Sequence, residues 1–167
     1  HGVVPFLREQ GIKYTAMDHI YDSSEGFDDV YRIMIEYIIA QAVEGEVVVA
    51  LPGHPLVGER LALELLNQLD AAEYDIRIIP GISRADAVLA LVQQSGLEGL
   101  KILMAPELEE RYINVRMATV ILNLYNRLLV SDVKVLLLRF YPPELEVYLS
   151  WQDDAGNLRY TRSEEHT

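Results

Sequence analysis

Two short loops carry the residues that are best suited to ligand chemistry. Residues 52–55 are Pro-Gly-His-Pro and residues 80–83 are Pro-Gly-Ile-Ser. Each loop combines a glycine, which lets the backbone approach a ligand closely, with a proline, which stiffens the turn. An apolar helical pattern follows each loop, and free N–H groups at a helix N-terminus bind anions. The pair predicts a small-molecule site, although an ordinary turn is an alternative for either loop alone.

His54 is the one titratable side chain in the first loop. An imidazole in this place could act as a general base or bind a metal. No second histidine or carboxylate stands at ligand spacing, because Glu59 belongs to the following helix. We therefore expect His54 to make a backbone or polar contact with a ligand, and we expect no metal site.

The loops are positioned by a strand and helix pattern that occurs twice. Residues 46–51 are a near-continuous run of β-branched side chains, as in a strand that is buried on both faces, and residues 74–79 predict a second strand. Residues 56–69 and 85–94 show helical spacing. This order predicts an α/β fold with a parallel sheet, whose ligands bind beyond the carboxyl ends of the strands.

The N-terminal part of the chain adds a short helix at residues 3–9, a half-buried strand at 12–17 and a longer helix from Phe27 that stops at Gly45. Glu25, Asp28, Asp29 and Glu36 could form a carboxylate cluster. Since acids near a helix N-terminus interact favourably with the helix dipole, a solvated helix face explains them better.

The second half of the sequence follows a different pattern. Runs at residues 101–104, 118–125, 133–141, 145–151 and 158–161 predict strands without long helices between them, with a turn at 153–157. A mixed sheet is expected here. The predicted domains are an N-terminal α/β subdomain at residues 1–97 and a C-terminal α/β subdomain with the mixed sheet at residues 98–167. Polar groups are dense at Arg127, Ser131, Asp132 and Lys134, which could line a cleft.

Charge and composition narrow the classes of partner. The chain has 14 basic and 26 acidic residues, for a formal charge of −12. An acidic surface repels phosphate backbones and anionic lipids, so we expect neither nucleic acid nor a membrane as a partner. The absence of cysteine excludes disulfides and thiolate metal sites, and with no signal peptide or membrane span in the sequence we expect a cytoplasmic protein.

Three ordered segments resemble the tetrapyrrole (corrin and porphyrin) methylase family. They are residues 47–59 (VVVALPGHPLVGE), 74–91 (YDIRIIPGISRADAVLAL) and 118–149 (ATVILNLYNRLLVSDVKVLLLRFYPPELEVYL). The family typically has Gly-Asp-Pro in the first loop. The Gly-His-Pro-Leu found here is similar to a branch of YabN-like proteins, in which the methylase-like domain is joined to a MazG-type pyrophosphohydrolase.

The resemblance implies an S-adenosylmethionine-dependent methyltransferase of two α/β subdomains that forms a homodimer and acts on a small-molecule substrate. It implies that the cofactor lies in a cleft bordered by both loops and by the segment that begins at Ala118. The residues implied to bind the cofactor are Pro52, Gly53, His54, Pro55, Leu56, Ile82, Ser83, Arg84, Ala118 and Val120. No general base is implied, because aligning the nucleophile with the methyl group supplies most of the acceleration.

Two positions depart from the family pattern. The family opens with a Gly-x-Gly-Pro-Gly loop, and nothing like it precedes Val3, so we expect a segment upstream of His1. Arg84 stands where many members have a small polar residue. The acidic balance gives no support to a substrate with many carboxylates, although Arg84, Arg127 and Lys134 could form a local basic site.

Two other functions stay open. The chain could be a non-catalytic regulatory or dimerising module of a MazG-type pyrophosphohydrolase, which would need no acid–base pair. An enzyme that acts on nucleotides itself is less well supported, because no repeat of acids at magnesium-binding spacing occurs.

Overall fold

A computed structural model of the chain describes residues 3–23, 26–153 and 155–163. His1 and Glu25, both named above, lie outside these residues. The described chain divides into two compact units. Unit 1 consists of residues 1–51 and 59–78, and unit 2 of residues 52–58 and 79–167. The boundary expected near residue 97 is not tested by this division and stays a prediction.

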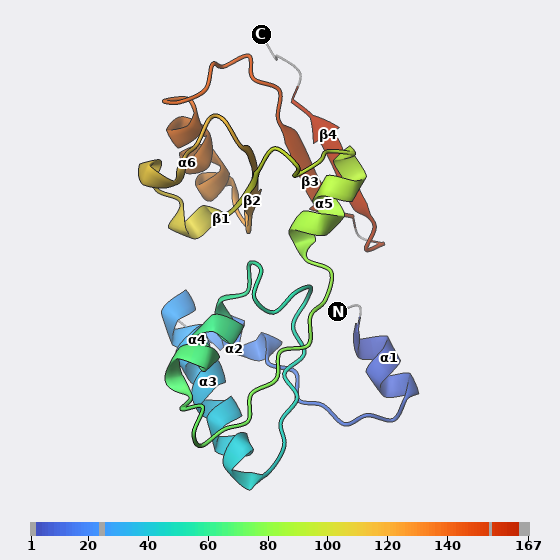
Figure 1. Cartoon of the computed structure of the whole chain (residues 1–167). Coiled ribbons are helices and arrows are strands. Elements are labelled where there is room, and N and C mark those ends of the chain that lie inside the picture. Colours follow the sequence, from blue (N-terminus) through green and yellow to red (C-terminus); the bar gives the residue numbers. More distant parts are fainter. Residues whose placement is uncertain (1–2, 24–25, 154, 164–167) are drawn as a thin grey trace. The chain divides into compact units, whose positions relative to one another are not determined.

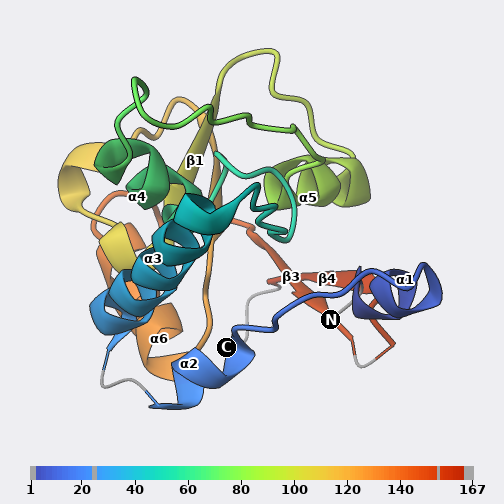
Figure 2. The same ribbon diagram turned by 90° about the horizontal axis from the view of Figure 1, so that it is seen from below.

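Unit 1 is helical in its described part. Its helices are α1 (Val3–Glu9), α2 (Asp18–Ser23), α3 (Phe27–Glu44) and α4 (Arg60–Gln68). Figures 1 and 2 show α3 and α4 side by side. Side chains of α3 recur at helical spacing on one face and pack against α2 and α4. The buried core of the unit is Ile20, Val30, Met34, Ile35, Ile38, Leu61 and Leu65. The helix expected from Phe27 to the stop at Gly45 is confirmed.

The described acids near α3, Asp28, Asp29 and Glu36, form ion pairs at the surface and no carboxylate cluster with one another. The Arg32 guanidinium lies 3.1 Å from Asp29 and 3.2 Å from Glu36, and Arg60 lies 2.7 Å from Asp28. These side chains are largely exposed, where an ion pair contributes at most about 1 kcal/mol. The solvated face expected from the sequence is confirmed for these three acids.

Unit 2 holds two separate two-stranded sheets and two α-helices among its described residues. Strand β1 (Leu100–Met104) pairs in parallel with β2 (Ala118–Leu122), with Ile102 opposite Val120. Strand β3 (Tyr148–Gln152) pairs antiparallel with β4 (Leu158–Arg162). The helices are α5 (Arg84–Val92) and α6 (Arg127–Leu137), and two 3₁₀ turns, Ala105–Glu107 and Glu110–Tyr112, lie between β1 and β2. The fold class is α/β, as expected.

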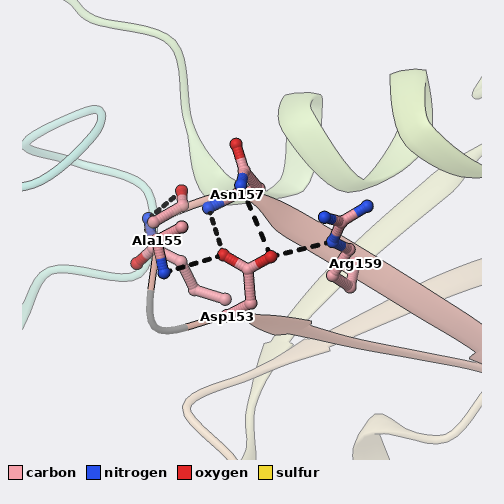
Figure 3. A network of polar contacts seen from close by, with 6 residues as sticks. Asp153, Ala155, Asn157 and Arg159 are labelled. Atoms are coloured by element: carbon pink, nitrogen blue, oxygen red, sulfur yellow. Dashed lines mark hydrogen bonds and ion pairs between the residues drawn. The ribbon is translucent and has the colours of Figure 1, made fainter.

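The turn between β3 and β4 is held by one carboxylate. Asp153 accepts hydrogen bonds from the backbone N–H groups of Ala155 (3.1 Å) and Asn157 (2.8 Å) and from the Arg159 guanidinium (2.9 Å) (Figure 3). The bond from Arg159 is the largest cause of a lowered pKa at Asp153, and the bond from Asn157 is the next. The turn predicted at residues 153–157 is confirmed for its described residues, 153 and 155–157.

Several expected strands are absent from the described residues. Residues 12–17, 46–51 and 74–79 are not paired into any sheet, so the parallel pair lies at β1 and β2 and not in the N-terminal part. The strand expected at 133–141 is wrong, because most of it belongs to α6. The apolar residues Leu129, Val133 and Leu136 of α6 are spaced by four and three residues, which places them on one face of the helix. In the described part of the chain, no helix is long and apolar enough to cross a membrane.

Candidate functional site

The first of the two loops, residues 52–58, is held by its own backbone and by His54. Gly53 and Gly58 adopt φ of 92° and 79°, in the left-handed region that favours glycine. The His54 Nδ1 atom accepts a hydrogen bond from the Leu56 N–H at 3.1 Å, and the His54 carbonyl accepts one from the Val57 N–H at 3.0 Å. A neutral His54 therefore carries its proton on Nε2, because Nδ1 acts as the acceptor.

The second loop packs directly on the first within unit 2. A Cβ placed on Gly81 would lie 2.6 Å from the Gly53 carbonyl oxygen, so a side chain at position 81 would collide with backbone. A Cβ on Gly53 would lie 3.4 Å from the Ile82 carbonyl oxygen and 3.8 Å from the Arg84 nitrogen. The glycines that the sequence singled out are thus the positions where two backbone segments meet.

Ser83 begins helix α5 through a reciprocal capping box. Its Oγ accepts a hydrogen bond from the Asp86 N–H (3.1 Å), and Asp86 Oδ2 accepts from the Ser83 N–H (2.8 Å) and hydroxyl (2.6 Å). Ser83 is 3% exposed. The hydrogen bonds from Ser83 are the main cause of a lowered pKa at Asp86, and the nearby His54 contributes in the same direction. Ser83 therefore has a structural role in fixing the second loop.

Two contacts place these loops at the carboxyl end of β2. The Arg84 guanidinium donates a hydrogen bond to the Asn123 Oδ1 at 3.3 Å, and Asn123 directly follows the strand. Gly58 lies against the last residue of the strand, since a Cβ there would come within 2.9 Å of Leu122 Cδ1. This edge is where parallel strands present ligand sites.

The structure brings eight of the ten expected cofactor-binding residues into two adjoining loops. These are Pro52, Gly53, His54, Pro55, Leu56, Ile82, Ser83 and Arg84. Ala118 begins β2, about 13 Å from the strand's last residue at the usual rise of about 3.3 Å per residue. Val120 lies at the middle of the strand. Their contact with a cofactor, like that of the other eight residues, stays a prediction.

A pocket of about 530 Å³ opens where β2 leads into α6. Arg127, Ser131 and Lys134 line it, as the sequence suggested, and Tyr125 and Val130 add apolar surface. Asp132 does not line it. Arg127, Ser131 and Lys134 are spaced by four and three residues, which places them on one side of the helix, whereas Asp132 is turned about 100° from Ser131.

Three residues of the site were not expected from the sequence. Asp86 was signalled by the Ser-x-x-Asp spacing from Ser83, which is a capping-box pattern. Asn123 has a φ of 62°, which asparagine tolerates better than other side chains, and its position at the end of an apolar run was the available signal. Gly58 gave no signal apart from being a glycine at the end of the loop.

The loops present unpaired backbone donors. In the described part of the chain, the N–H groups of Gly53, His54, Gly81 and Ile82 donate to no backbone carbonyl. Backbone N–H groups that are not used within the protein can bind an anionic or polar ligand group without any charged side chain. Chemically, the arrangement can hold and orient a ligand that lies against backbone.

Comparison with known proteins identifies a family and a relative. A family model described as Tetrapyrrole (Corrin/Porphyrin) Methylases matches residues 2–152. A curated relative, the uncharacterized protein YabN of Bacillus subtilis (strain 168), is 26% identical over 149 residues. The match covers 89% of this chain and 30% of the relative, so the chain spans about a third of the length of that protein. Because the family model covers most of the sequence, the chain belongs to the tetrapyrrole (corrin and porphyrin) methylases, whose members use S-adenosylmethionine as methyl donor.

Proposed function

We propose that the chain is a methyltransferase domain that holds S-adenosylmethionine against the two loops at residues 52–58 and 81–84 and transfers its methyl group to a small molecule. The observation that carries this proposal is the direct packing of the loops at Gly53 and Gly81, beside the carboxyl end of β2. Membership of the methylase family supports the reaction class.

The residues present fit such a donor. S-Adenosylmethionine carries a carboxylate, and the four unpaired N–H groups of the loops suit an anionic group. The glycines at 53 and 81 let the two loop backbones pack against each other, since a Cβ at either position would approach the backbone of the other loop. Arg84 is held in place by Asn123 and adds a cation at the same edge.

The chemistry asks little of the chain beyond positioning. When bound, the donor supplies an electrophilic methyl group on a sulfonium. The protein's own residues orient the reactants, and alignment at near-attack distance accounts for a large share of the acceleration in such displacements. His54 is engaged by the Leu56 N–H through Nδ1, so we assign it a role in shaping the loop and not in proton transfer.

Calorimetry with S-adenosylhomocysteine tests the proposal on the protein as it is encoded. Binding in a 1:1 ratio that is weakened in Gly81→Ala is expected. Gly45→Ala is the matched control, since a Cβ at that extended position meets nothing within 4 Å. The absence of binding heat to the wild-type protein would count against a methyl-donor site.

A second candidate, a regulatory or dimerising module of a MazG-type pyrophosphohydrolase, is supported by the length of the YabN relative, most of which lies outside the match. In that case the protein would form a homodimer through this domain, and its pyrophosphohydrolase partner would depend on it. Sedimentation of the protein and the hydrolysis rate with and without this domain are the tests. A monomer with an unchanged hydrolysis rate contradicts this second function.

A further inference from the structure

The pocket between β2 and α6 has an unusual charge for this chain. The whole sequence carries 26 acidic residues, yet no Asp or Glu among residues 3–23, 26–153 and 155–163 lines the pocket, whereas both Arg127 and Lys134 do. None of the ion pairs in the described part of the chain involves either cation. Other arginines of the protein, such as Arg111 and Arg159, are held by carboxylates. The pocket is therefore a local site of positive charge in an acidic protein.

The geometry of α6 keeps the two cations together. Arg127 and Lys134 are seven residues apart, about two helical turns, and Ser131 lies between them on the same side. Each of the three can donate a hydrogen bond to an anionic oxygen. The N-cap residue, Asn126, accepts a hydrogen bond from the Leu129 N–H at 2.8 Å, so this N–H group of the helix terminus is already used. The positive charge of the pocket comes from the Arg127 and Lys134 side chains.

The rest of the pocket is apolar or aromatic. Val130 is 40% exposed and Tyr125 is 53% exposed, and both line the pocket beside the cations. A cationic side next to an aromatic side matches a ligand with one anionic group on an apolar or planar body. Two cations balance one carboxylate or phosphate and do not balance a ring of many carboxylates.

The pocket begins next to a residue that contacts Arg84, at the end of the second loop. Its lining begins at Leu124, one residue after the Asn123 that holds Arg84. We infer that Arg127, Ser131 and Lys134 form an anion-binding site that anchors a small amphipathic molecule through a single carboxylate or phosphate. Its assignment to the methyl acceptor rests on the proposed function, whereas the anion site itself does not.

Calorimetric titration of the encoded protein tests the site with three aromatic probes: phenyl phosphate, benzoate and uncharged benzyl alcohol. We expect one or both anions to bind and the alcohol to bind at least about tenfold more weakly. Phosphate and carboxylate are distinguished by which probe binds more tightly. Binding should weaken as salt is added, because exposed charges are screened. Equal affinity for the alcohol would overturn the inference.

Variants locate the binding. Arg127→Gln and Lys134→Gln are each expected to weaken anion binding roughly fivefold, in keeping with partly exposed charge pairs of about 1 kcal/mol. Arg116→Gln removes the same charge from an exposed arginine that forms no described ion pair and does not line the pocket, and it should leave binding unchanged. Unchanged binding in both pocket variants, or an equal loss in Arg116→Gln, refutes the site.

A parallel titration with S-adenosylhomocysteine separates this inference from the proposed function. If the pocket variants bind the anions weakly but bind S-adenosylhomocysteine normally, the anion site stands as a distinct part of the domain. Anion binding that depends on Arg127 and Lys134 without any binding of S-adenosylhomocysteine would support the site and remove the methyltransferase proposal. Normal S-adenosylhomocysteine binding without anion binding would remove the site alone.

Discussion

Replacement of Gly81 by alanine is the most direct test of how the two loops meet. The added Cβ would lie 2.6 Å from the Gly53 carbonyl oxygen, and ordinary van der Waals contact begins at about 3.4 Å. The loops must therefore separate by about 0.8 Å. Because the neighbouring atom belongs to the backbone, no side-chain rotation relieves the contact. Overpacking of this kind typically costs about 1–3 kcal/mol.

The expected result is a lower free energy of unfolding by this amount, measured by urea denaturation. If the loops also hold the methyl donor, the displaced backbone should weaken S-adenosylhomocysteine binding about 5- to 150-fold for the same energy. Gly45→Ala, at an extended position with nothing within 4 Å, should change stability by less than about 1 kcal/mol. Wild-type stability of Gly81→Ala would refute the close approach of Gly81 to Gly53.

Three further predictions concern the elements around the site. Ser83→Ala removes the N-cap of α5 and should lower the free energy of unfolding by about 0.5–2 kcal/mol in urea denaturation. Ser150→Ala, at an exposed strand position, is the control and should change this free energy little. Equal effects of the two variants would contradict the capping role. Ile35→Ala leaves a cavity at a side chain that is 2% exposed and should lower the free energy of unfolding by about 2–5 kcal/mol by the same measurement. Val43→Ala, at a residue that is 71% exposed, should lower it by less than about 0.5 kcal/mol. An equally small loss for Ile35→Ala would place Ile35 outside the core. The lowered pKa of Asp153 means that its carboxylate stabilises the β3–β4 hairpin above its unfolded pKa of about 3.9, and this contribution is lost as the pH falls through the folded value. Amide exchange in the hairpin, measured from pH 6 to pH 3, should therefore become less protected relative to Asp153→Asn, and a constant difference between the two proteins would argue against it.

The long helix of unit 1, α3, could be predicted because its spacing of apolar residues can be recognised without knowledge of any other element. Val30, Met34 and Ile38 recur every four residues over several turns, and Gly45 follows as a stop. Such periodicity reports on one element alone, and the buried face it predicts is the one found in the core. The strand at 158–161 and its turn were predictable for a similar reason, since strand and turn residues are adjacent in sequence.

Strands that need distant partners could not be predicted in the same way. Residues 46–51 have the composition of a buried strand and residues 74–79 favour a second one, but a strand also requires a neighbour that pairs with its N–H and C=O groups. No such neighbour pairs with them in the described chain. Residues 133–137 were misassigned because Val133 and Val135 favour strands, while the helical spacing and the Asn126 cap favour α6.

The site was predictable in its glycines and not in its connections. Gly53 and Gly81 could be singled out because glycine next to proline marks a loop that can approach a ligand. The packing of one loop on the other, and the bond from Arg84 to Asn123, join segments that are many residues apart. The spacing of residues along the sequence does not indicate such long-range contacts, so only the folded structure shows them.

The two glycines of the first loop determine which of its positions can be substituted. Gly53 and Gly58 both need positive φ, and both lie against neighbouring segments, so the loop's ends are constrained by backbone geometry. The four residues between them, His54 to Val57, carry all the side chains of the loop apart from that of Pro52. Exchange of this tetrapeptide for that of another family member would change the chemical character of the loop between two fixed ends, provided that the new residue at position 54 replaces the hydrogen bond that His54 accepts from the Leu56 N–H.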